Sequence, residues 1–214
     1  MNLVEQFEEE IEGKRSPLKI ILVVFLILLI ALMTFSYYAI KIDPKPGFRV
    51  SLSEAIENAP DYEGDNRIGT IQGAKSLPIS DFMRHIVGKV GSSCKDVEDV
   101  CYAKAFYYFV RDEIEYIPDP DQQIIEVPER TLLSGSSDCE NEAILLSVML
   151  KGVGIKSRIV LIDRHAYVQA YLPEAAKSYK MEGDWVGLDP TCKNCEFGNV
   201  PPKDFEILNY VYMY

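Results

Sequence analysis

The chain has 214 residues, of which 48% are hydrophobic and 26% charged, a balance that excludes a disordered acidic protein. Its 33 acidic and 22 basic residues give a net charge of −11, whereas a nucleic-acid-binding protein needs a basic surface to neutralise phosphates. Because the only histidines are His85 and His165, a histidine-rich metal site is also excluded, and we expect no metal and no cofactor.

A membrane anchor is predicted near the N-terminus. A short acidic tail, residues 1–19, precedes the segment 20–40, IILVVFLILLIALMTFSYYAI, which contains no charged residue. As a helix this segment would be about 32 Å long, enough to cross a hydrocarbon core of about 30 Å. A cleaved signal peptide would have a shorter apolar region and a small-x-small cleavage site, but here Tyr37 and Tyr38 crowd Ala39. We therefore expect one uncleaved transmembrane helix.

The composition changes after the apolar segment. Pro44 and Pro46 cannot continue a helix, because proline lacks a backbone donor and favours extended geometry in the residue before it. Residues 41–75 are rich in glycine and are predicted to form a juxtamembrane spacer with one short helix at 52–58. Residues 76–214 carry the remaining periodic apolar pattern and are predicted to form one compact domain.

Helices are predicted before strands within this domain. Apolar residues three and four positions apart indicate amphipathic helices, and short alternating runs indicate strands. This order favours an α+β architecture over a wound parallel sheet. The predicted helices span 80–90, 96–116 and 140–151, and the predicted strands span 158–162, 165–172 and 185–189.

Three residues stand out as candidates for nucleophilic chemistry. Cys139 follows a Gly/Ser loop at the start of a predicted helix, where unpaired N–H groups and the helix dipole lower a thiol pKa. His165 begins a predicted strand, on the strand face that mixes polar and aromatic residues. Asp189 ends the last predicted strand, just before Pro190. A thiolate, an imidazole and an orienting carboxylate are what cysteine–histidine catalysis requires.

These segments resemble the transglutaminase-like superfamily. The resemblance rests on SDCENEAILLSVMLKGVGIKSRIV from Ser137, on HAYVQAY from His165 and on WVGLDPT from Trp185, in that order. The upstream stretch YAKAFYYFVRDEIEYIPDPD also looks like the helix that precedes the catalytic segment in prokaryotic members. The resemblance implies a papain-like fold and a Cys-His-Asp triad, with Cys139 as nucleophile, His165 as base and Asp189 as orienting residue.

The sequence departs from the family pattern in two places. Ser137 stands where many members have glycine, and the region matching the oxyanion-stabilising tryptophan of crosslinking members, DQQIIEVPERTL, has no tryptophan. A side-chain amide can donate to an oxyanion, which makes Gln122 or Gln123 a candidate donor beside the Cys139 backbone N–H. These departures favour hydrolysis over protein crosslinking.

The resemblance therefore implies a membrane-anchored thiol hydrolase, a cysteine protease or amidase that acts on a protein or peptide substrate through an acyl-enzyme. Two alternatives stay open at this stage. In an acyl transferase an amine would resolve the acyl-enzyme, as in protein crosslinking. A catalytically inactive domain would bind peptides. The sequence indicates no oligomeric state.

The four remaining cysteines indicate on which side of the membrane the domain lies. They are predicted to form two disulfides, with structural zinc as the alternative, and disulfides would place the domain outside the cytosol. Three basic residues precede the apolar segment and three follow it, so the positive-inside rule does not orient the anchor. We expect an internal N-terminus and an extracytoplasmic domain. The cysteines are Cys94, Cys101, Cys192 and Cys195.

Overall fold

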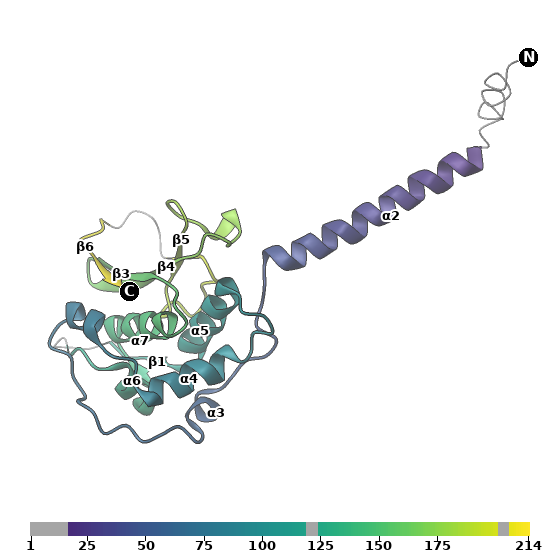
Figure 1. Cartoon of the computed structure of the whole chain (residues 1–214). Coiled ribbons are helices and arrows are strands. Elements are labelled where there is room, and N and C mark those ends of the chain that lie inside the picture. The colour runs from purple at the N-terminus through teal and green to yellow at the C-terminus, as the bar shows by residue number, and fades with distance from the viewer. Residues whose placement is uncertain (1–16, 119–123, 201–205) are drawn as a thin grey trace, which may run out of the picture. The chain divides into compact units, whose positions relative to one another are not determined.

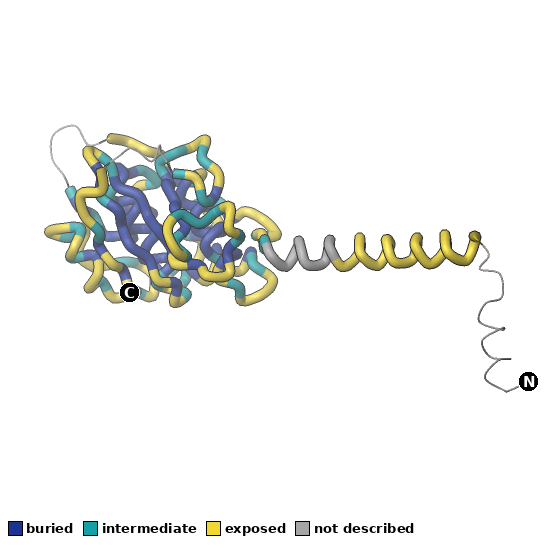
Figure 2. The backbone as a smooth tube through the Cα atoms, turned by 90° about the horizontal axis from the view of Figure 1, so that it is seen from above, coloured by how far each residue is buried: buried dark blue, intermediate teal, exposed yellow. Residues whose placement is uncertain are grey.

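The computed structural model describes residues 17–118, 124–200 and 206–214, and the chain divides into two compact units, Met1–Ile42 and Asp43–Tyr214. The first unit contains helix α2, Pro17–Ile42, which covers the whole apolar segment. Its side chains from Pro17 to Thr34 are all exposed, unlike those of a core helix (Figure 2). The helix is long and apolar enough to cross a membrane, a property that signal sequences share.

The second unit is an α+β domain, as predicted (Figure 1). Its strands β5, β4, β3 and β6 form an antiparallel sheet in that order, and β1 and β2 form a separate parallel pair. The helices of this unit are α3 (Leu52–Ile56), η1 (Ile71–Ser76), α4 (Asp81–Gly91), α5 (Asp99–Glu113), α6 (Pro128–Ser134), α7 (Cys139–Gly152) and η2 (Lys177–Tyr179). The strands are β1 (Glu115–Tyr116), β2 (Ser136–Ser137), β3 (Ser157–Ile162), β4 (His165–Tyr171), β5 (Trp185–Leu188) and β6 (Asn209–Met213).

Helix α7 is the centre of the domain. One side packs on β3 and β4, and the other sides contact α4, α5 and α6 (Figure 1). The helix is therefore buried around its circumference, with Ile144, Leu145 and Leu146 all at 0% exposure. Because a helix enclosed in this way has almost no freedom to shift, its first residue, Cys139, is held in a fixed position.

Most predicted elements are confirmed within about three residues. Helix α5 is shorter than predicted and begins at Asp99, because the chain before it turns at Cys94. Six elements were not predicted: the short helices η1 and η2, the two-residue strands β1 and β2, the helix α6, which begins at Pro128, and β6, which pairs with β3 at the edge of the sheet. Proline at the first helical turn is a start signal that would have indicated α6.

Most of the predicted spacer 41–75, from residue 43 on, packs against the domain. Val50, Ala55 and Ala74 are buried in the main core. The segment is also tied to the domain by hydrogen bonds, with Gly47 N donating to Ser93 O (2.7 Å) and Leu52 N donating to Glu113 Oε2 (2.8 Å). The glycine content suggested a spacer, but the scattered apolar side chains reach the core and make this segment part of the fold.

The outer face of the sheet also differs from prediction. The strand face of His165 was predicted to mix polar and aromatic residues, yet its members Tyr167 and Gln169 are buried, at 5% and 3% exposure. Arg158 covers them: its Nε donates to Gln169 Oε1 (2.7 Å), and its guanidinium lies over the rings of Trp185 and Tyr210. The two ends of β4, at His165 and at Tyr171, keep exposure on this face.

Candidate active site

The start of α7 is fixed by its capping residue. Asp138 is extended (φ −88°, ψ −176°), and its side chain accepts a hydrogen bond from Asn141 N (3.0 Å). The Asn141 amide in turn accepts from Glu126 N (2.8 Å) and donates to Ile124 O (2.9 Å), which ties the helix start to the chain before α6. Cys139 is thus the first helical residue, as predicted, and is 6% exposed.

The Cys139 sulfur lies within hydrogen-bond distance of a neighbouring carboxylate. Sγ donates to Glu140 Oε2 (2.9 Å). Burial first, and then Glu140, raise the pKa of Cys139 to about 12, while a backbone hydrogen bond from Ala166 acts in the opposite direction. The expected lowering of this pKa is therefore wrong for this state, because burial and adjacent carboxylates outweigh the helix N-terminus.

His165 and Asp189 are joined by a hydrogen bond. His165 Nε2 lies 2.9 Å from Asp189 Oδ2, and the other carboxylate oxygen accepts from Thr191 N (3.1 Å) and Thr191 Oγ1 (2.8 Å). Asp189 is 1% exposed, so its charge lies in a protein environment where these hydrogen bonds replace water. Because Nε2 of His165 is used in this hydrogen bond, Nδ1 is the imidazole nitrogen left for another partner.

The three predicted site residues are therefore brought together by the fold, although they come from three elements. The hydrogen bond joins His165 to Asp189, and Ala166, the residue after His165, contacts the sulfur of Cys139. The other candidates, Gln122 and Gln123, lie outside the described residues.

All four remaining cysteines form disulfides, as predicted, which leaves no thiolates for zinc. Cys94 lies before α5 and is bonded to Cys101 within it, and Cys192 is bonded to Cys195. Cys139 is the free cysteine of the chain.

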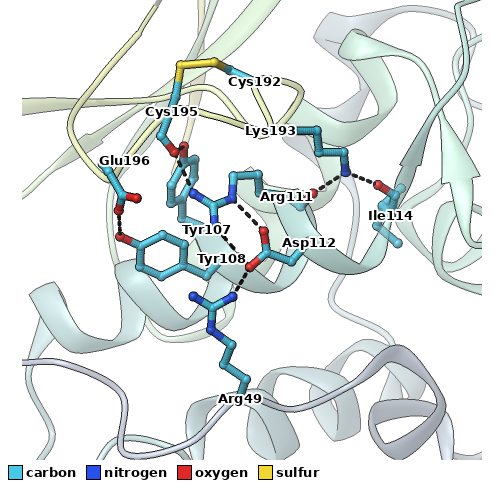
Figure 3. A network of polar contacts seen from close by, with 10 residues as sticks. All are labelled: Arg49, Tyr107, Tyr108, Arg111, Asp112, Ile114, Cys192, Lys193, Cys195 and Glu196. Atoms are coloured by element: carbon cyan, nitrogen blue, oxygen red, sulfur yellow. Dashed lines mark hydrogen bonds and ion pairs between the residues drawn. A yellow bond between two sulfur atoms is a disulfide. The ribbon is translucent and has the colours of Figure 1, made fainter.

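The Cys192–Cys195 disulfide closes the loop after Asp189 and docks it on α5 (Figure 3). Lys193 Nζ donates to the carbonyl of Ile114 (2.6 Å) and to that of Arg111. The carbonyl of Cys195 accepts from Arg111 Nη1 (2.6 Å) and from the hydroxyl of Tyr107 (2.9 Å). The Asp189 carboxylate therefore precedes a loop that is fixed at both ends, by β5 and by α5.

The sequence analysis did not identify Glu142. It lies one turn after Cys139, is 0% exposed, and neither carboxyl oxygen has a hydrogen-bond partner among the described residues. Burial raises the pKa of Glu142 to about 8; Lys193 opposes this shift, and Asp189 and Asp138 add to it. The sequence signal that could have indicated it is an acidic residue three positions after the cysteine, directly before the apolar run 143–146 of the helix.

A separate cavity of about 570 Å³ lies between residues 45–50 and α5. It is lined partly by the aromatic side chains of Phe48, Tyr108 and Phe197. Cys139, His165 and Asp189 do not line it. The cysteine site is therefore distinct from this cavity.

Comparison with known proteins gives the family of this chain. A family model described as the transglutaminase-like superfamily matches residues 84–190, half of the chain, and this range includes Cys139, His165 and Asp189. No curated protein matched the sequence. Structures of Legionella pneumophila LapG are similar, including calcium-bound and EGTA-treated forms: identity is 14–15%, the TM-score is 0.44, and 75–76% of this chain and 82–83% of theirs are covered. This chain belongs to the transglutaminase-like superfamily.

Proposed function

We propose that the protein is a thiol hydrolase that cleaves a peptide or amide bond through an acyl-enzyme on Cys139. The observation that carries the proposal is the His165–Asp189 hydrogen bond of 2.9 Å next to the helix start that holds the free cysteine. Nucleophile, base and orienting group on separate rigid elements are the requirement of this chemistry.

Each residue has one role in this proposal. The Cys139 sulfur attacks the substrate carbonyl, while His165 accepts the thiol proton and then protonates the leaving amine. Asp189 orients the imidazole through Nε2 and stabilises its charged form. Water then resolves the acyl-enzyme, with His165 accepting the proton of that water.

The thiol must leave Glu140 before it reacts. In the described state Sγ donates to Glu140, and its pKa is far above neutral pH. We therefore propose that His165 removes the proton as the attack begins, rather than holding a thiolate–imidazolium pair at rest. A substrate that excludes water and displaces the Glu140 carboxylate would favour this transfer.

We further propose that α2 anchors the domain in the membrane and that the domain is extracytoplasmic. Two observations support this location: the exposed apolar helix and the pairing of four cysteines in disulfides, which form in oxidising compartments. A substrate at or near the membrane surface would be within reach of such an enzyme.

The test uses full-length protein in detergent and a mixed peptide library. We expect wild-type protein to release new peptide termini and the Cys139→Ala variant to release none. Adding a primary amine distinguishes hydrolysis from transfer, because incorporation of the amine in place of water would show an acyl transferase. Wild-type protein that binds peptides without forming a covalent adduct would instead show a binding domain.

A further inference from the structure

Strand β1 holds Tyr116 beside the chain that leads into Cys139. Tyr116 and Ser137 are register partners in the parallel β1–β2 pair. Hydrogen bonds from Glu115 N to Gly135 O (2.9 Å) and from Ile117 N to Ser137 O (2.9 Å) fix this register on both sides of the tyrosine. Tyr116 therefore keeps a fixed position relative to the start of α7.

The side chains of Tyr116 and Cys139 lie on the same side of this pair. Register partners in neighbouring strands project to the same face, which places Tyr116 with Ser137. Across the extended residue Asp138, Ser137 and Cys139 are two positions apart and again share a face. The electrostatic interaction of the Tyr116 phenol with the Cys139 sulfur agrees with this placement.

The phenol is also suited to act as a donor. Burial, the Cys139 sulfur and nearby carboxylates raise the pKa of Tyr116, so the hydroxyl keeps its proton well above neutral pH. The side chain is 40% exposed, which leaves it accessible to a substrate at the cysteine. The carboxylates are those of Asp138, Glu140 and Glu142.

The proposed reaction needs such a donor. When sulfur attacks a carbonyl carbon, the C–S bond forms and the carbonyl π electrons move to oxygen, which becomes an oxyanion. The acidic side chains near Cys139 would repel the negative charge of this oxyanion. A neutral side chain that donates a hydrogen bond would offset the repulsion. Tyr116 is a neutral donor on the correct face.

We infer that Tyr116 donates its phenolic hydrogen bond to the oxyanion formed on attack by Cys139. The inference rests on the proposed acyl-enzyme mechanism. The phenol keeps its proton throughout; collapse of the intermediate restores the C=O bond and expels the leaving group, which takes its proton from His165. The donor acts only in the tetrahedral state, so it accelerates acylation without strengthening substrate binding.

Two reactions of the same sulfur test this role. Acylation of Cys139 by p-nitrophenyl acetate passes through an oxyanion, whereas alkylation by iodoacetamide displaces iodide at an sp³ carbon and forms none. Full-length wild type and Tyr116→Phe are compared in detergent, with adducts at Cys139 quantified by mass spectrometry. Tyr171→Phe is the matched control, because Tyr171 is 39% exposed and lies at the far end of β4.

We expect Tyr116→Phe to slow acylation roughly 100-fold, the usual effect of losing one oxyanion donor, with an unchanged alkylation rate and circular dichroism spectrum. Tyr171→Phe should change neither rate. Equal slowing of both reactions would mean that Tyr116 only tunes or positions the thiol. An unchanged acylation rate would exclude Tyr116 as the donor. Either result overturns the inference, while the thiol hydrolase proposal stands. Alkylation of wild type without any acylation would overturn both.

Discussion

His165 Nε2 and Asp189 Oδ2 lie 2.9 Å apart, and Thr191 holds the other carboxylate oxygen through its backbone N–H and its hydroxyl. His165 opens β4 and Asp189 follows β5, and these strands are neighbours in the sheet. The orientation of the imidazole is thus set by two paired strands and one short loop.

Substitutions at the three site residues should act as one unit. Cys139→Ala is expected to reduce peptide cleavage by about 10⁴-fold or more and His165→Ala nearly as much, because the proton transfer fails without either group. Asp189→Ala should cost about 10²-fold, since it removes orientation only. Initial cleavage rates and circular dichroism give the measurements.

His85 is the control for this series. It lies on α4, where Nε2 is 3.1 Å from Glu57 O, away from the three site residues. His85→Ala should keep wild-type activity. Full activity in Cys139→Ala would contradict the proposed mechanism.

Replacing Glu142 should change how stability depends on pH. In the folded state its pKa is about 8 against an ordinary 4.5, so the unfolded chain ionises first as pH rises. Stability is therefore lost between about pH 4.5 and 8, by about 5 kcal/mol at most at 1.4 kcal/mol per pKa unit. Glu142→Gln removes this loss, so the variant should be more stable than wild type at pH 8.5 and similar to it at pH 5.

Urea unfolding at several pH values measures this effect. Glu182→Gln, at an exposed glutamate, should reproduce the wild-type curve. A Glu142→Gln variant destabilised equally at pH 5 and pH 8.5 would show that the carboxyl group has a partner that the amide cannot replace.

Breaking the Cys192–Cys195 disulfide should impair activity more than stability. The Cys192→Ser/Cys195→Ser variant frees the loop after Asp189, which weakens the orientation of His165, and we expect a loss of activity of about 10-fold. The stability loss should be about 2 kcal/mol, because the closed loop is short.

The Cys94→Ser/Cys101→Ser variant is the matched comparison. Its disulfide also closes a short loop, with a sequence separation of 7, but it lies before and within α5, away from Asp189. We expect a similar fall in the urea midpoint with activity retained at 25 °C. Equal activity losses in both variants would show that the 192–195 loop has no special role.

A domain comprising Asp43–Tyr214 should fold without the helix, whereas residues 76–214 alone should be much less stable. Removing residues 43–75 uncovers the core around Val50, Ala55 and Ala74 and deletes the hydrogen bond from Leu52 N to Glu113. Thermal unfolding followed by circular dichroism distinguishes the two. Equal melting temperatures would restore the spacer interpretation.

The local pattern determined most elements of this fold. Apolar periodicity located α4, α5 and α7, because each buries one face or its whole circumference, and alternation located β3 and β4. Cys139, His165 and Asp189 were selected as candidates by residue type, position and order, all of which can be read from the sequence. The C-terminal β6 was not found, because an edge strand is stabilised mainly by its partner, here β3, whose paired residues are about 50 positions away in the chain.

The tertiary structure alone decided the electrostatics and the packing of the site. A helix start predicts a lowered thiol pKa, but how deeply Cys139 is buried and where the Glu140 carboxylate lies depend on the assembled domain, and these terms dominate. The same holds for Glu142, whose burial follows from enclosure of α7 by the sheet and three helices. It holds too for Tyr116, whose proposed role depends on the pairing of β1 with β2. Local sequence specifies which groups are present, whereas desolvation and long-range pairing, which set their pKa values and their neighbours, arise only when distant segments pack together.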